Sequence, residues 1–191
     1  MQDKNEHINL LLKACKNQDQ TAQFEIYKLY YKAMFNAALR IVKDSFEAED
    51  VMQEAFLSAF TKLDTFKGEV PFGAWLKKIV INKSLTQVKK NNRFEEVKLE
   101  KVEYKMADGI SEESIENEAS DYTSLKVKEI VKKIDELKEN YRIALSLSLI
   151  EGYDNEEIAE IMNISNENCR TTISRAKNKL RSLLNQQVEM R

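Results

Sequence analysis

The sequence predicts an all-α fold of two small helical domains joined by a flexible acidic linker, the second domain containing a helix-turn-helix. The chain of 191 residues has only 4 Gly and 1 Pro, which leaves little material for hairpins or barrels. Apolar residues recur at steps of three and four in both halves, as in amphipathic helices. This periodicity fades across residues 95–121, where ten acidic residues stand among three lysines. We therefore expect domains at residues 1–94 and 122–191, with the linker at 95–121.

The residue inventory gives little support for an enzyme. The chain has 1 His, 2 widely separated Cys and no Gly-rich phosphate loop. Neither Cys15 nor Cys169 has a His or a second Cys at metal-ligand spacing, so we predict no catalytic residues, no metal site and no cofactor. The apolar run at residues 8–12 is too short for a signal-peptide core or a membrane span, and the thiols suit a reducing compartment. A cytoplasmic protein is expected.

The net charge of -2 hides an uneven distribution. Residues 1–94 carry 15 Lys and Arg against 11 Asp and Glu, residues 95–139 carry 8 against 14, and residues 140–191 carry 7 against 7. The acidic middle masks basic surfaces on either side, so the near-neutral total does not argue against nucleic-acid binding.

Two helices with apolar stripes are expected early in the first domain. Residues 21–42 show a wide apolar stripe typical of a core helix. Asp44 and Glu47 have the spacing of a capping box for the next helix. Two interpretations of that helix's outer side stay open, an ordinary solvated face or a docking patch for a basic partner. The side chains concerned stand at i, i+3 and i+4: Asp50, Gln53 and Glu54.

A loop containing the only Pro and the only Trp precedes a basic helix. Pro71 is suited to open a helix because its missing N–H donor costs nothing there. The helix, expected over residues 72–90, buries Trp75 and turns lysines outward. Exposed rings in the loop together with lysines would suit unstacked bases, and the alternative is an ordinary lysine face over a core Trp.

The C-terminal half carries the pattern of a helix-turn-helix. Asp154 and Glu157 form a capping box for a short helix, and Asn163 tolerates the left-handed backbone of a tight turn. Ser165 is suited to cap the following helix. The buried seam of that helix is predicted from residues spaced four, three, four and three apart: Cys169, Ile173, Ala176, Leu180 and Leu183.

The outward face of this last helix has chemistry suited to the DNA major groove. Residues 166–181 carry five Lys and Arg against one Glu. Arg can bridge guanine acceptors, Asn can pair with adenine, and Lys can neutralise phosphates. The alternative is a plain helical hairpin with a basic surface. The outward residues are Asn166, Glu167, Asn168, Arg170, Thr171, Ser174, Arg175, Lys177 and Lys179.

Taken together, four segments resemble the group IV, or extracytoplasmic-function, sigma factors, which bind bacterial RNA polymerase and direct it to promoters. The segments are "FEIYKLYYKAMFNAALRIVKD", "AEDVMQEAFLSAF", "FGAWLKKIVINKS" and "YDNEEIAEIMNIS" with the following "TTISRAKNKL". They occur in the family's order, and the resemblance covers nearly the whole chain.

The resemblance implies that the first domain docks on core RNA polymerase and opens the -10 element, while the second reads the -35 element of promoter DNA. The implied contacts with the polymerase clamp helices are Asp50, Gln53 and Glu54. The loop from Phe66 to Trp75 is implied to capture the -10 strand, with Trp75 itself packing inward. The other implied -10 contacts are Lys77, Lys78, Asn82, Lys83, Lys89 and Lys90. The implied -35 contacts are Asn166, Asn168, Arg170, Thr171, Ser174, Arg175 and Lys177.

The same resemblance implies further partners. They are the polymerase flap and an anti-sigma factor, and the acidic linker is implied to run toward the RNA channel. The chain departs from the family pattern at Thr86, where Asp is common, and at Thr172, where Arg is common.

Two other classes of protein remain as alternatives. A stand-alone helix-turn-helix regulator would bind duplex DNA without polymerase, usually as a symmetric dimer. A helical adaptor would use its basic faces only to meet acidic proteins. The regulator needs no acidic helix followed by an aromatic loop and a lysine helix, and the adaptor predicts no promoter-specific transcription.

Overall fold

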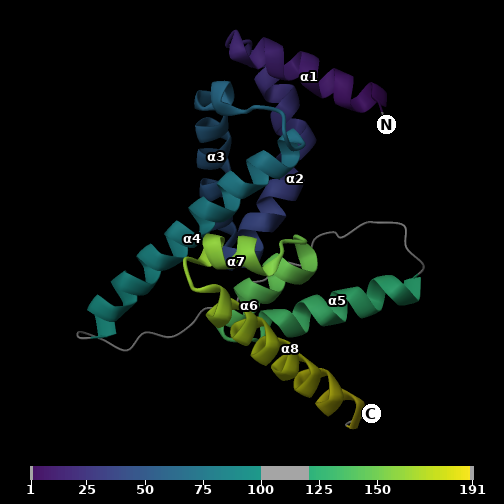
Figure 1. Cartoon of the computed structure of the whole chain (residues 1–191), viewed down its shortest axis with the longest axis vertical. Coiled ribbons are helices and arrows are strands. Elements are labelled where there is room, and N and C mark those ends of the chain that lie inside the picture. Colours follow the sequence, from purple (N-terminus) through teal and green to yellow (C-terminus); the bar gives the residue numbers. More distant parts are fainter. Residues whose placement is uncertain (1, 100–120, 190–191) are drawn as a thin grey trace. The chain divides into compact units, whose positions relative to one another are not determined.

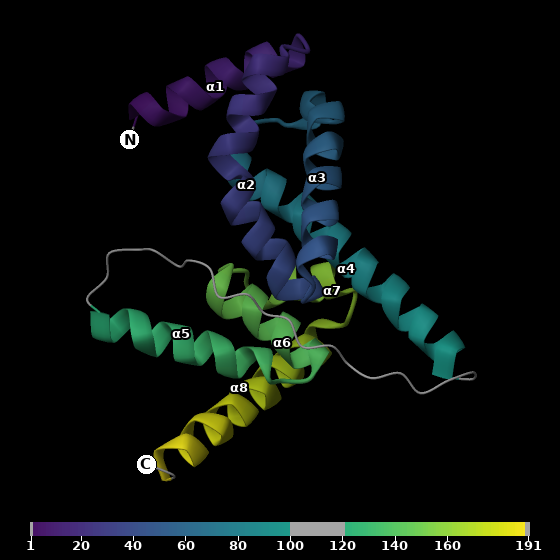
Figure 2. The same ribbon diagram turned by 180° about the vertical axis from the view of Figure 1, so that it is seen from behind.

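The computed structural model describes residues 2–99 and 121–189, with side chains for residues 6–92 and 126–185. The chain divides into two compact units, residues 1–90 and 91–191. Every element within the described ranges is helical (Figures 1 and 2), which confirms the predicted all-α fold.

The first unit is built around α2 (Gln20–Val42). α2 begins after Asp19, whose carboxylate accepts hydrogen bonds from the backbone N–H groups of Thr21 and Ala22. α1 (Gln2–Lys16) and α3 (Ser45–Thr61) both pack against α2. A 3-10 turn (Leu63–Thr65) follows α3, and α4 (Phe72–Leu99) comes next and extends beyond the unit's last residue, Lys90.

The core of this unit is aliphatic and methionine-rich. Ile26 and Met34 of α2 lie fully buried with Met52 of α3 and Leu76 of α4. The apolar stripe predicted for residues 21–42 is narrower than expected. Its outer members Phe24 and Tyr31 are exposed, and Phe24 lies under the Lys28 ammonium at 4.6 Å.

The aromatic rings around the loop before α4 pack against one another. The Phe66 and Trp75 ring centroids are 5.3 Å apart, and Phe72 lies 5.7 Å from Trp75 and 5.5 Å from Tyr30. Phe72 is buried, and Phe66 and Trp75 are half-buried against the core. The expectation of exposed rings in this loop is therefore wrong, because the rings pack against one another in tilted and edge-to-face pairs that draw them inward. Packing of Trp75 is confirmed.

α4 is longer than the expected range of residues 72–90. Its backbone is helical to Leu99, past the first residues of the linker predicted at 95–121. The rest of the predicted linker, residues 100–120, lies outside the described residues, and α5 begins at Asp121.

The second unit contains α5 (Asp121–Asp135), α6 (Glu139–Leu145), a π-helical turn (Ser146–Ile150), α7 (Asn155–Met162) and α8 (Asn166–Glu189). α6 and α7 pack against α8. Gly152, at φ 80°, ends the π turn in the left-handed conformation expected for it.

A buried arginine lies in the core of the second unit. Burial lowers the pKa of the Arg142 guanidinium, and the nearby carboxylates of Asp135 and Glu139 act in the opposite direction. The Arg142 side chain is part of the packing of this unit rather than of a surface.

The described residues hold no grouping of His, Cys, Asp or Glu suited to a metal ion. Nor does any helix in this part of the chain have the length and apolar character needed to cross a membrane.

Candidate nucleic-acid interface

Three local features fix the start of α7 and the turn between α7 and α8. The Asp154 carboxylate accepts a hydrogen bond from the Glu157 N–H at 2.9 Å, and the Glu157 carboxylate accepts one from the Asp154 N–H at 3.0 Å. Asn163 ends α7 at φ 56° and ψ 51°, in the left-handed region. The Ser165 hydroxyl then accepts a hydrogen bond from the Asn168 N–H at 3.2 Å, which caps α8. The three predictions for this segment are confirmed.

One side of α8 is buried along most of the seam predicted for it. Cys169, Ile173, Ala176 and Leu180 are buried, whereas Leu183 is half-buried. Burial raises the pKa of the Cys169 thiol, and the charge of Arg170 partly offsets this. The thiol is therefore a neutral packing group.

Thr172 is a buried polar residue that the sequence pattern missed. Its hydroxyl lies 3.4 Å from the side-chain oxygen of Asn168, to which it donates a hydrogen bond. Because Thr172 lies on the buried side of α8, the position where the family commonly has Arg does not reach the outer face here.

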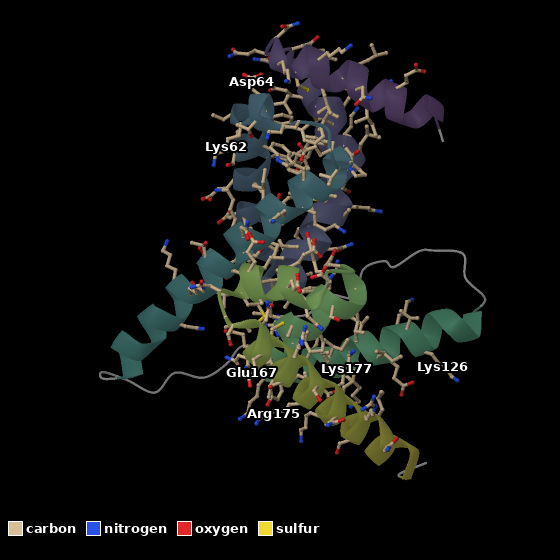
Figure 3. All side chains as sticks on the ribbon, viewed as in Figure 1. Lys62, Asp64, Lys126, Glu167, Arg175 and Lys177 are labelled. Atoms are coloured by element: carbon tan, nitrogen blue, oxygen red, sulfur yellow. The ribbon has the colours of Figure 1, made fainter. Side chains whose placement is uncertain are left out.

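The opposite side of α8 gathers the predicted polar residues on one broad face. All are exposed except Lys177, which is half-buried. With about 100° between successive residues, Glu167, Thr171 and Ser174 stand in the middle of this face, and Arg170 and Arg175 lie on either side of them. Lys177 lies beyond Arg170 at one edge, so Arg175 and Lys177 point to different sides of the helix, and Glu167 adds one acidic group between them (Figure 3).

The predicted acidic patch lies on the exposed side of α3. Asp50, Gln53 and Glu54 are all exposed. The Gln53 amide donates a hydrogen bond to the Glu49 carboxylate at 3.2 Å. Glu54 forms an ion pair with Lys83 of α4, with 3.2 Å between Nζ and Oε2.

The six predicted residues of α4 do not share one face. Lys78, Asn82 and Lys89 are exposed and stand at steps of four and seven, on one side of the helix. Lys83 and Lys90, a step of seven apart, turn toward α3 and line a groove with its acidic residues. Lys77 is half-buried on a third side.

A second hollow, which the sequence did not reveal, lies beside the loop before α4. It has a volume of about 320 Å³, and α1, α2 and the loop itself supply its walls. Gly68 turns the loop at φ 78°. The lining residues are Ile8, Asn9, Tyr30, Gly68, Glu69, Val70, Pro71 and Phe72.

Two sequence profiles match the chain in the order of its two units. Sigma-70 region 2 matches residues 26–94, and Sigma-70 region 4 matches residues 128–180. The first range holds α3 and most of α4, and the second holds the α7–α8 turn.

Characterised relatives match over most of their length. The RNA polymerase sigma-H factor of Pseudomonas aeruginosa is 30% identical, with 81% of this chain and 82% of the relative covered. The ECF RNA polymerase sigma factor SigW of Bacillus subtilis is 29% identical, covering 93% of this chain and 96% of the relative. The ECF RNA polymerase sigma-E factor of Escherichia coli is also 29% identical, covering 88% and 89%.

Solved structures share the fold. CnrH in complex with the cytosolic domain of CnrY is similar at a TM-score of 0.53 and 23% identity, covering 92% of this chain and 96% of that one. The sigma factor RpoE in complex with the anti-sigma factor NepR, from Bartonella quintana, gives a TM-score of 0.55 at 24% identity, covering 97% and 98%.

Proposed function

We propose that the two units of this chain have different roles in transcription initiation. The chain belongs to the sigma-70 family, in its extracytoplasmic-function (ECF) group. The protein is an alternative sigma factor, which directs RNA polymerase to start transcription at specific promoters. Within that activity, the first domain (residues 1–94) docks on core polymerase and opens the -10 element, and the second domain (residues 122–191) reads the -35 element. The observation that carries this proposal is the capped α7–α8 turn, which holds one broad polar face of α8 outward.

We assign reading of the -35 element to the outer face of α8. Thr171 and Ser174, in the middle of that face, and Arg170 and Arg175, on either side of them, are the groups that would reach base edges if α8 enters the major groove. The residues at its edges would contact the phosphates on either side. They are Asn166, Asn168 and Lys177.

We assign polymerase docking to the exposed patch on α3. Asp50 and Glu54 present carboxylates, and Gln53 presents an amide, within two turns of one helix. Such a surface complements a basic partner such as the clamp helices of polymerase.

We assign binding of the -10 strand to α4 and the loop before it. Lys78, Asn82 and Lys89 share one exposed side, which suits a single strand that follows the helix. Lys83 and Lys90 would contact phosphates from the side that faces α3, and Lys77 would contact them from a third side. Since the rings of Phe66 and Phe72 are packed inward, backbone and lysine contacts carry more of this role than ring stacking does.

The remaining partners are proposed from the family. One solved structure with the same fold is a sigma factor in complex with an anti-sigma factor, and we propose that an anti-sigma factor regulates this chain as well. We propose that the second domain contacts the polymerase flap. Because a sigma factor works with RNA polymerase, we propose a cytoplasmic location.

The docking assignment is tested by charge reversal on α3. The double variant Asp50→Lys, Glu54→Lys should lose most of its affinity for core polymerase, because like charges would then face the basic partner. Binding is measured by titrating labelled core polymerase with the purified chain. The matched control reverses two carboxylates elsewhere in the same unit, Glu6→Lys and Glu25→Lys, and should bind as the parent does. Undiminished binding by the double variant would remove the patch from the interface.

A further inference from the structure

The polymerase-docking side of α3 and one side of α4 form the two walls of a groove. Each wall is a stripe of four residues at i, i+3, i+4 and i+7, so the groove runs along both helices for two turns. Its volume is about 400 Å³. The lining residues are Glu47, Asp50, Val51 and Glu54 on α3, and Lys83, Thr86, Gln87 and Lys90 on α4.

Two side-chain contacts cross this groove. The Lys83 ammonium lies 3.2 Å from the Glu54 carboxylate, and the Gln87 amide donates a hydrogen bond to the Glu47 carboxylate at 3.3 Å. The first contact joins a residue assigned to polymerase with a residue assigned to DNA. The two proposed surfaces therefore share one ion pair.

The Lys83–Glu54 pair is well placed to exchange its partners. The side chains are 32% and 68% exposed, so both ends of the pair can be reached from solvent. An exposed ion pair of this kind shifts a folding or binding equilibrium by only about 1.4- to 5-fold, so little free energy is needed to separate the two side chains. While it is formed, the carboxylate cancels much of the positive potential that a phosphate would meet at Lys83.

We propose that Glu54 is a positioning residue that holds Lys83 away from DNA in the free protein, and that docking of polymerase on α3 releases the lysine for the -10 strand. This inference rests on the proposed assignments of Glu54 to polymerase and of Lys83 to DNA. When a basic group of the polymerase pairs with the Glu54 carboxylate, Lys83 no longer has a carboxylate beside it. Its ammonium can then bind the phosphates of the promoter strand.

The coupling acts in both directions. A phosphate that binds Lys83 leaves the Glu54 carboxylate open to the basic partner, so DNA and polymerase each favour the binding of the other. The protein thus binds single-stranded DNA weakly on its own and more tightly after docking, without any change in the fold.

The first test measures binding of the free, full-length chain to a labelled single-stranded oligo-dT at low ionic strength, by fluorescence anisotropy. Glu54→Gln should bind about two- to fivefold more tightly than the parent, because Lys83 has lost its partner. The control is Glu49→Gln, which removes the same charge from the same helix, where Glu49 accepts a hydrogen bond from Gln53 rather than pairing with a lysine. Glu49→Gln should show a smaller gain, from net charge alone.

A double-mutant cycle isolates the pair. In a Lys83→Met background, the gain from Glu54→Gln should shrink to that of Glu49→Gln. A gain that persists without Lys83, or one that Glu49→Gln equals in the parent, overturns the inference. If Lys83→Met itself leaves oligonucleotide binding unchanged, the assignment of Lys83 to DNA fails, which is a different result. Lys83→Gln provides a second uncharged variant, and a thermal melt checks each fold.

The reverse direction gives an independent readout without DNA. Lys83→Met should bind core polymerase about two- to fivefold more tightly than the parent, since Glu54 is then unpaired. Lys62→Met removes an exposed lysine near the end of α3 and should leave polymerase binding unchanged. Equal affinities for Lys83→Met and the parent would contradict the coupling.

Discussion

Arg170 and Arg175 stand on either side of Thr171 and Ser174 on the outer face of α8, where both guanidinium groups are exposed. Arg170→Ala and Arg175→Ala should each cost about 1 to 3 kcal/mol at the -35 element and relax its sequence preference if the guanidinium reads a base. An arginine that contacts a phosphate instead should, when replaced by Ala, weaken binding to all sequences alike. Holoenzyme footprints on promoter variants measure both effects.

The matched control for these two variants is Arg181→Ala on the same helix. Arg181 is exposed, and its guanidinium donates a hydrogen bond to the Asn178 side chain at 2.8 Å. It lies outside the proposed reading set and should leave the footprint unchanged. Footprints that keep full -35 dependence in both Arg170→Ala and Arg175→Ala would remove α8 from the interface.

The two buried thiols predict a loss of stability at alkaline pH. Burial raises the pKa of Cys15 and of Cys169 above the ordinary value of 9.0, and the charge of Asp19 adds to the effect at Cys15. A group whose pKa is higher in the folded state contributes stability that is complete below its unfolded pKa and is lost as the pH rises through the folded value. The free energy of unfolding should therefore fall as the pH rises past about 9.

Urea denaturation between about pH 8 and pH 9.5 measures this slope below the main titration range of tyrosine. The double variant Cys15→Ala, Cys169→Ala should show a flatter slope than the parent, whatever its stability at pH 8. An identical slope in both proteins would assign the alkaline loss to other groups.

At the scale of the element, the end of α7 depends on one residue in an unusual backbone conformation. Asn163 holds φ 56° and ψ 51°, a region that residues with a Cβ rarely adopt, although Asn adopts it more readily than most. Asn163→Ala should lower the free energy of unfolding by about 1 kcal/mol, whereas Asn163→Gly should leave it nearly unchanged. Thermal unfolding of the full chain compares the three proteins, and equal losses in both variants would point to the Asn side chain rather than the backbone.

The helix ends show how far local sequence determines the elements. Asp44, Asp154 and Ser165 mark starts that could be predicted, because each cap acts on N–H groups two or three residues away. α1 was not predicted, although Leu12 and Cys15 face the core at helical spacing, because its short apolar run carries no cap signal. The π turn at Ser146–Ile150 had no signal in the spacing of apolar residues.

Some features of the candidate site likewise follow from the local sequence, whereas others depend on contacts between residues far apart in the chain. The exposed face of α8 follows from a 3.6-residue period and could be predicted from the sequence alone. The contact between Glu54 and Lys83 could not, because it joins residues 29 apart on two helices and depends on how α4 crosses α3. The exposure of Phe24 and Tyr31 was also missed, since periodicity alone does not show how wide a stripe the neighbouring helices cover.

At the scale of the whole molecule, the uneven charge agrees with two separate surfaces for two kinds of partner. Acidic residues gather on α3 for a basic protein, and the outer face of α8 carries excess positive charge for DNA. Neither surface alone explains promoter-specific initiation, because one surface binds polymerase and the other recognises the promoter sequence. The central claim is therefore that a single chain brings polymerase to promoters that share two elements.

Transcription of sheared genomic DNA by purified core polymerase, with and without this chain, tests that claim most directly. Start sites mapped by sequencing should include new ones that depend on the chain and share two upstream elements, near -10 and -35. Binding of the chain to duplex DNA without any new start would contradict the account and favour a stand-alone helix-turn-helix regulator.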